Sequence, residues 1–184
     1  MSAAAAHPRE PVPDAKGPLR RACDLIDRIN EWAGLFWGFT ILLVTAAVLY
    51  EVVARTVFGS PTNWGNETTI YLSAMAYLLA GGYALLHRRH VRIDVLYEAL
   101  SPRMRVRLDA FTFVFFLAYV VTLIWAGGIG AWDSFQIGET TSTPWNPPIW
   151  PVKLAIPAAG VLLLLQGIAN LVRDLGWVPG GAPR

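Results

Sequence analysis

The sequence predicts an all-α membrane protein with four transmembrane helices, and two observations carry that prediction. Of its 184 residues, 54% are hydrophobic and only 15% are charged, whereas a soluble domain has about 25% charged residues. The apolar residues are also gathered into four long blocks, and about 20 apolar residues match the hydrocarbon thickness of a bilayer. In lipid each block must be helical, because every backbone polar group needs a partner within its own segment.

The four blocks define the domain organisation. We expect a single transmembrane domain over residues 19–177, with spans at about residues 32–58, 67–86, 108–132 and 150–172. Residues 1–18 and 178–184 are rich in Ala, Pro and Gly, so we expect a disordered N-terminal tail and a flexible C-terminal tail. The N-terminal tail lacks the apolar core and cleavage site of a signal peptide.

The distribution of Lys and Arg predicts the orientation. Basic residues lie before the first span, between the second and third spans, and after the fourth, whereas residues 59–66 and 133–149 contain none. The positive-inside rule then places both termini and the middle connection in the cytoplasm of a multi-pass inner-membrane protein. Arg55 and Lys153 lie near the outer ends of their spans, where long side chains can reach water.

Two cytoplasmic segments have amphipathic patterns. Leu19, Cys23, Ile26 and Ile29 repeat at helical spacing before the first span, and a shorter stripe covers residues 93–100. We expect both segments to be helices in the membrane interface or against a partner. The alternative is that their apolar faces pack on the protein's own helices.

Polar residues within the spans are the candidates for function. Glu51 and Arg55 are four residues apart, so they share a helix face and form either a partner contact, an ion path or a self-contained pair. Glu67 follows Asn66, which is the expected N-cap of the second span, and its carboxylate either favours the helix dipole or recognises a partner.

Other residues in the spans indicate packing. Ala76, Ala80 and Ala84 have the spacing that lets helices approach closely, within this chain or with another. Gln166 and Asn170 can hydrogen-bond a neighbouring helix. Most tryptophans fall near span ends, as is typical of rings at the headgroup level, and Trp37 and Trp125 are instead expected to fill the core. A proline-rich segment at residues 140–151 is expected to be an ordered loop held by its tryptophans.

No residue pattern indicates catalysis. We find no metal-binding spacing of Cys or His and no glycine loop that cradles phosphate, so we predict no catalytic, cofactor or metal site and no enzyme activity. The net charge of +2 is too small to indicate nucleic acid binding.

Two segments resemble the small, DctQ-like membrane subunit of tripartite ATP-independent periplasmic (TRAP) transporters. In the first, that family shows an Arg, an aromatic-Gly turn, a Trp and a Glu, which correspond here to Arg55, Phe58-Gly59, Trp64 and Glu67. Many members have two acidic residues where this chain has Asn66-Glu67. In the second, a basic patch with a His precedes a hydrophobic-Asp pair, here His90 and Ile93-Asp94.

The resemblance implies a scaffold subunit that supports a large multi-span permease subunit in secondary transport. A periplasmic solute-binding protein would deliver a small solute, typically an organic acid, and an ion gradient, usually sodium, would drive uptake through ion sites in the large subunit. The candidate interface or structural residues are Glu51, Arg55, Trp64, Glu67, Ala76, Ala80, Asp94 and Lys153. The alternative function is a self-sufficient homo-oligomeric channel or carrier built around Glu51 and Arg55.

The predicted orientation can be tested by charge reversal. Replacing Arg88, Arg89 and Arg92 together with Glu reverses three of the six positive charges between spans two and three, so we expect disturbed insertion or orientation. The accessibility of single cysteines in the two connections that lack Lys and Arg would report it. Unchanged topology in the triple variant would mean that these charges serve another purpose.

Overall fold

We describe the fold from a computed structural model, which describes residues 17–87 and 102–174. Its helices are α1 (Pro18–Thr56), α2 (Gly65–Leu79), α3 (Gly81–Leu86), α5 (Pro102–Gln136) and α6 (Trp150–Asp174). The predicted tails, apart from Gly17 and Pro18, and the amphipathic stripe at residues 93–100 with Asp94 lie outside the described residues.

The all-α prediction with four spans is confirmed. Four helical segments are long and apolar enough to cross a membrane: α1, α2 with α3 as one crossing, α5 from Phe111, and α6 to Arg173. Helices α2 and α3 are separated only at Ala80, whose backbone N–H still donates to the Ala76 carbonyl at 3.1 Å. Pro157 lies inside α6 without ending that helix.

The sequence predicted an interfacial helix before the first span, but in the structure the two segments form one helix, α1. It runs without a break through 39 residues, a length of about 58 Å at 1.5 Å per residue, which is about twice the hydrocarbon thickness. The segment before Trp32 is therefore part of the same helix as the first span.

The face that α1 buries also differs from the predicted apolar stripe. Of that stripe Cys23 is buried and Ile26 is partly buried, but Leu19 and Ile29 are exposed, whereas Asn30 and Gly34, which are outside the stripe, are buried. A side chain at Gly34 would overlap the ring of Tyr83 on α3, so the glycine permits the helices to approach closely. Close packing and polar contacts thus decide the face, because lipid does not repel Leu or Ile.

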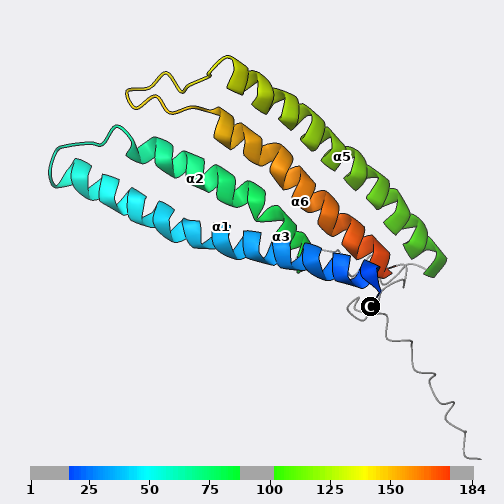
Figure 1. Cartoon of the computed structure of the whole chain (residues 1–184). Coiled ribbons are helices and arrows are strands. Elements are labelled where there is room, and N and C mark those ends of the chain that lie inside the picture. Colours follow the sequence, from blue (N-terminus) through cyan, green and yellow to red (C-terminus); the bar gives the residue numbers. More distant parts are fainter. Residues whose placement is uncertain (1–16, 88–101, 175–184) are drawn as a thin grey trace, which may run out of the picture.

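The helices form a single layer (Figure 1). The order across the layer is α1, then α2 with α3, then α6, then α5. The two inter-helix connections that the structure describes, residues 57–64 and 137–149, lie at one end, which we call the loop end. The opposite end, where α1 begins and α6 finishes, carries Arg20, Arg21, Arg28 and Arg173, and we call it the basic end.

Glycines bring α5 and α6 together. A side chain at Gly160 or Gly167 of α6 would overlap Ile124 or Phe116 of α5, and Gly127 of α5 lies against Ile156 of α6. Without a hydrophobic driving force between helices in lipid, such close van der Waals packing supplies much of the attraction.

Two tryptophans were expected to fill the core, and for one of them the expectation is wrong. Trp37 is partly buried, but Trp125 of α5 is 71% exposed. The layer explains the difference, because α5 lies at its edge and buries only the face toward α6.

We predict that Gly167→Leu destabilises the α5–α6 contact by about 1–3 kcal/mol, the usual cost of overpacking, since the new side chain would meet the Phe116 ring. The measurement is the thermal unfolding midpoint in detergent. Gly38→Leu on α1 is the matched control, because a Cβ there has nothing within 4 Å. Equal midpoints for the two variants would contradict this account of the packing.

Candidate functional site

Polar side chains gather at the two ends of the layer. Among the described residues, no group of three or more His, Cys, Asp or Glu side chains could hold a metal ion. The contacts at these ends are hydrogen bonds and ion pairs between helices and connections. We describe the loop end first and the basic end second.

At the loop end, Glu51 and Arg55 form the pair that their spacing predicts. The Arg55 Nη2 and Nε atoms donate to Glu51 Oε1 at 2.7 and 3.2 Å. The second carboxylate oxygen accepts from the Thr62 backbone N–H at 3.1 Å and from the Thr62 hydroxyl. Both oxygens of Glu51 are thus satisfied inside the chain, and its side chain is only 13% exposed. This geometry favours the self-contained pair over an ion path.

The first connection is folded back onto α1 by these contacts. Trp64 stacks on Tyr50 with ring centroids 5.8 Å apart, and it is the N-cap residue of α2. The prediction of Asn66 as N-cap is wrong, because the helix already begins at Gly65. The Gly65 N–H donates instead to the Thr62 hydroxyl at 3.1 Å, which satisfies one of the free donors at the helix start.

Glu67 lies beneath the second connection. Its side chain is nearly buried and accepts a hydrogen bond from the Thr141 hydroxyl at 3.1 Å. One helical turn further along α2, the Tyr71 hydroxyl donates to the Pro148 carbonyl at 3.0 Å. The proline-rich connection is therefore tied to α2 by polar contacts from two neighbouring turns.

The expectation that tryptophans hold this connection is only partly met. Trp150 packs edge-on against Phe135 at 5.5 Å, but Trp145 is 46% exposed. The connection is also held by its own backbone, since the Ile149 N–H donates to the Glu139 carbonyl at 2.9 Å.

Lys153 also holds the second connection. Its ammonium forms a salt bridge with the Glu139 carboxylate. The hydrogen bond from Lys153 holds the pKa of the Glu139 carboxyl below its ordinary value. Glu139 was not predicted as a partner of Lys153, because a spacing of 14 residues does not indicate a contact between them.

The basic end holds a buried polar network between α1 and α6. The Arg173 guanidinium donates to both oxygens of Asp27, at 3.0 and 2.6 Å. The Gln166 amide nitrogen donates to Asp27 at 3.0 Å, and its amide oxygen accepts from Asn30 at 2.9 Å. Asn30 and Gln166 are completely buried. One chain of hydrogen bonds thus runs from an ion pair into the interior.

Helix α3 closes the network. The Asn30 side-chain oxygen has no hydrogen-bond partner among the described residues, and it occupies the space that a side chain at Gly82 would need. Asn170 donates to the Leu85 carbonyl at 3.4 Å, a long contact. The predicted hydrogen bonding of Gln166 and Asn170 to a neighbouring helix is confirmed. Asp27 and Asn30 were not predicted as their partners, because Asp27 lies among the charged residues that the sequence places on the solvated face of an interfacial helix.

The small residues of the second span have different environments. Ala76 is buried within this chain, and Ala80 is partly buried at the junction of α2 and α3. What the two ends can do is hold the helices and connections in one arrangement.

We predict that Asp27→Ala destabilises the protein by about 3–5 kcal/mol, because it leaves the Arg173 guanidinium, only 9% exposed, without its partner. The measurement is again the thermal midpoint in detergent. Asp24→Ala is the matched control, since the Asp24–Arg20 pair is exposed and 3.9 Å long and is worth about 0–1 kcal/mol. If the two variants unfold alike, the network does not hold α1 to α6.

Comparison with known proteins agrees with this arrangement. Residues 44–176 match the family of tripartite ATP-independent periplasmic transporters, DctQ component. The sialic acid TRAP transporter permease protein SiaT of Haemophilus influenzae is 25% identical over 148 residues, which are 78% of this chain and 22% of that protein. The C4-dicarboxylate TRAP transporter small permease protein DctQ of Vibrio cholerae is 25% identical over 113 residues, 61% of this chain and 46% of that protein.

The chain thus spans less than half the length of either relative. The family match nevertheless covers most of the chain, including three of its four spans completely and the C-terminal part of the first. The chain is therefore a multi-pass membrane protein of the DctQ-component family, the small subunit of TRAP transporters.

Proposed function

We propose that this chain is the static scaffold subunit of a secondary transporter in the bacterial inner membrane, with both termini in the cytoplasm. Its partners are a large multi-span permease subunit, which moves the solute, and a periplasmic solute-binding protein, which delivers it. The chain itself binds no cofactor and catalyses no reaction. A sodium gradient drives the uptake through sites in the large subunit.

The open layer is the observation that carries this proposal. Among the described helices, α5 makes its extensive contact only with α6, so the four spans do not close around a central path. Three ion pairs lie at its ends: Glu51 with Arg55, Asp27 with Arg173, and Glu139 with Lys153. Such a layer offers broad apolar faces to another membrane protein but little to a solute.

A homo-oligomeric channel around Glu51 and Arg55 is less well supported. To line an ion path, the Glu51 carboxylate would need to face water, yet its two oxygens are already taken by Arg55 and Thr62. Opening that pair would release the first connection from α1, because Thr62 also accepts from the start of α2.

The solute is proposed to be a small organic acid. The two relatives are named for sialic acid and for C4-dicarboxylates, which are both carboxylates. The Asp94 region, which resembles the family's basic patch and hydrophobic-Asp pair, is proposed to contact the large subunit on the cytoplasmic side.

Purification of the tagged chain from native membranes in mild detergent tests the proposal. We expect mass spectrometry to identify a large multi-span membrane protein in the same complex, and we expect deletion of this chain to abolish uptake of the organic acid. Recovery of the chain alone, as a defined oligomer that transports ions in vesicles, would contradict the proposal and favour the channel.

A further inference from the structure

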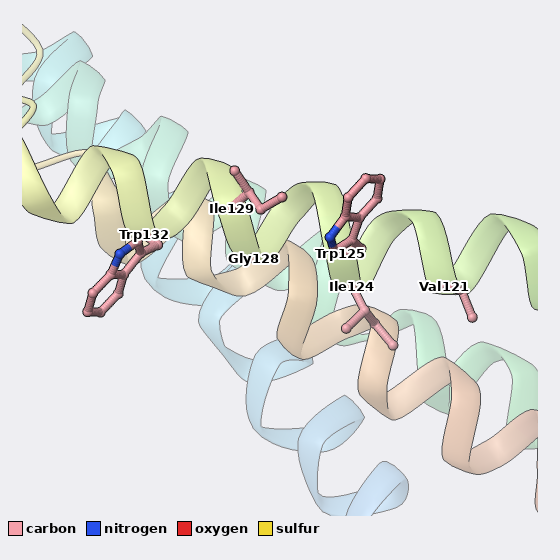
Figure 2. Close-up of a pocket in the computed structure, with 6 residues that line it drawn as sticks. All are labelled: Val121, Ile124, Trp125, Gly128, Ile129 and Trp132. Carbon is pink, nitrogen blue, oxygen red and sulfur yellow. The ribbon is translucent and has the colours of Figure 1, made fainter.

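One face of α5 carries a row of side chains that no other described helix covers. Val121, Trp125, Gly128 and Trp132 follow each other at intervals of four, three and four residues, which is the spacing of a coiled-coil contact. With Ile124 and Ile129 they line a shallow groove made entirely by α5 (Figure 2). Because Ile124 also packs against Gly160 of α6, we restrict the name α5 seam to Val121, Trp125, Gly128 and Trp132.

Apolar residues alone would not distinguish this face, since lipid-exposed faces of a span are apolar too. Trp125 does distinguish it. The apolar part of α5 covers Phe111–Gln136, so Trp125 lies about 21 Å from its beginning and about 16 Å from its end. That is close to the middle of a hydrocarbon core of about 30 Å, whereas Trp side chains prefer the headgroup level at either surface.

The exposed indole also carries an unused donor. Trp125 is 71% exposed, and its ring N–H makes no hydrogen bond to any described residue. In the hydrocarbon region an acyl chain offers no acceptor, so the N–H would remain unsatisfied at a cost. A protein surface with an acceptor removes that cost.

Gly128 shapes the seam between the two tryptophans. A side chain there would meet nothing within 4 Å, and Figure 2 shows the rings of Trp125 and Trp132 on either side of it along the α5 ribbon. The result is a notch flanked by two bulky rings, where a large side chain from a neighbouring helix fits. Small residues at helix contacts permit this kind of close approach.

A second copy of the chain does not fit this notch well. Two copies in one membrane share an orientation, so a twofold contact between their α5 helices would be parallel and would place each residue opposite itself. Trp125 would then face Trp125, and Gly128 would face Gly128. The two large rings would then collide, and the two notches would face each other unfilled.

We propose that the α5 seam docks a transmembrane helix of the large permease subunit, an inference that rests on the proposed function above. The partner helix places a small residue and a hydrogen-bond acceptor at Trp125 and a large apolar side chain over Gly128. The seam thereby gives the otherwise unpartnered edge of the layer its contact in the complex.

Gly128→Leu in the full complex tests the seam. The new side chain fills the notch, so we expect the yield of large subunit captured with the tagged chain to fall about tenfold or more. Gly130→Leu is the matched control: it adds the same side chain to the same helix, also with nothing within 4 Å, but about 200° around the axis. Its capture should equal that of the unaltered chain.

A photoactivatable cross-linker at position 125 gives an independent measurement in the assembled complex. We expect a cross-link to the large subunit. Cross-links only to lipid or to a second copy, or full capture by Gly128→Leu, would overturn the docking site while leaving the proposed function intact. If the unaltered chain captures no large subunit at all, the proposed function itself fails, and the docking site fails with it.

Discussion

The buried network of Asp27, Asn30, Gln166 and Arg173 is the constraint on which the layer depends. It joins the first turns of the long α1 helix to the last turns of α6, two segments almost at opposite ends of the chain. Asn30 and Gln166 are completely buried and Arg173 is nearly so, and a buried charge or amide without a partner is costly. Each member therefore needs the others, and this requirement selects one register of α1 against α6, with α3 held between them.

The rest of the layer follows from that fixed end. Gly34 and Gly82 admit Tyr83 and Asn30 at the crossing of α1 and α3, and Gly160 and Gly167 seat α5 on α6. At the loop end, polar contacts from Glu51, Glu67, Tyr71 and Lys153 fasten the two connections to the helices. Polar groups thus position both ends, while close packing at small residues joins the apolar middle.

The division between polar contacts at the two ends and close packing in the apolar middle suits the supporting role that we propose. Because the ion pairs of Glu51, Asp27 and Glu139 are made within the chain, the layer keeps apolar faces for contact with lipid or with other membrane helices. A scaffold must keep its shape while its partner moves, and paired charges at both ends of the spans favour one conformation over alternatives. The edge helix α5, with one face committed to α6 and the other uncovered, is where such a layer can be extended by a second protein.

The sequence by itself determined the four apolar spans, their ends to within a few residues except for the start of the first, and the Glu51–Arg55 pair, because length, hydropathy and helical spacing are local properties. Only the tertiary structure decided which residues are buried. In a soluble protein hydrophobicity marks the core, but lipid is as apolar as Leu. The sequence pattern therefore could not predict that Trp125 is exposed and that Asn30 is buried. Partners such as Asp27 and Arg173, 146 residues apart, become visible only when the helices are packed.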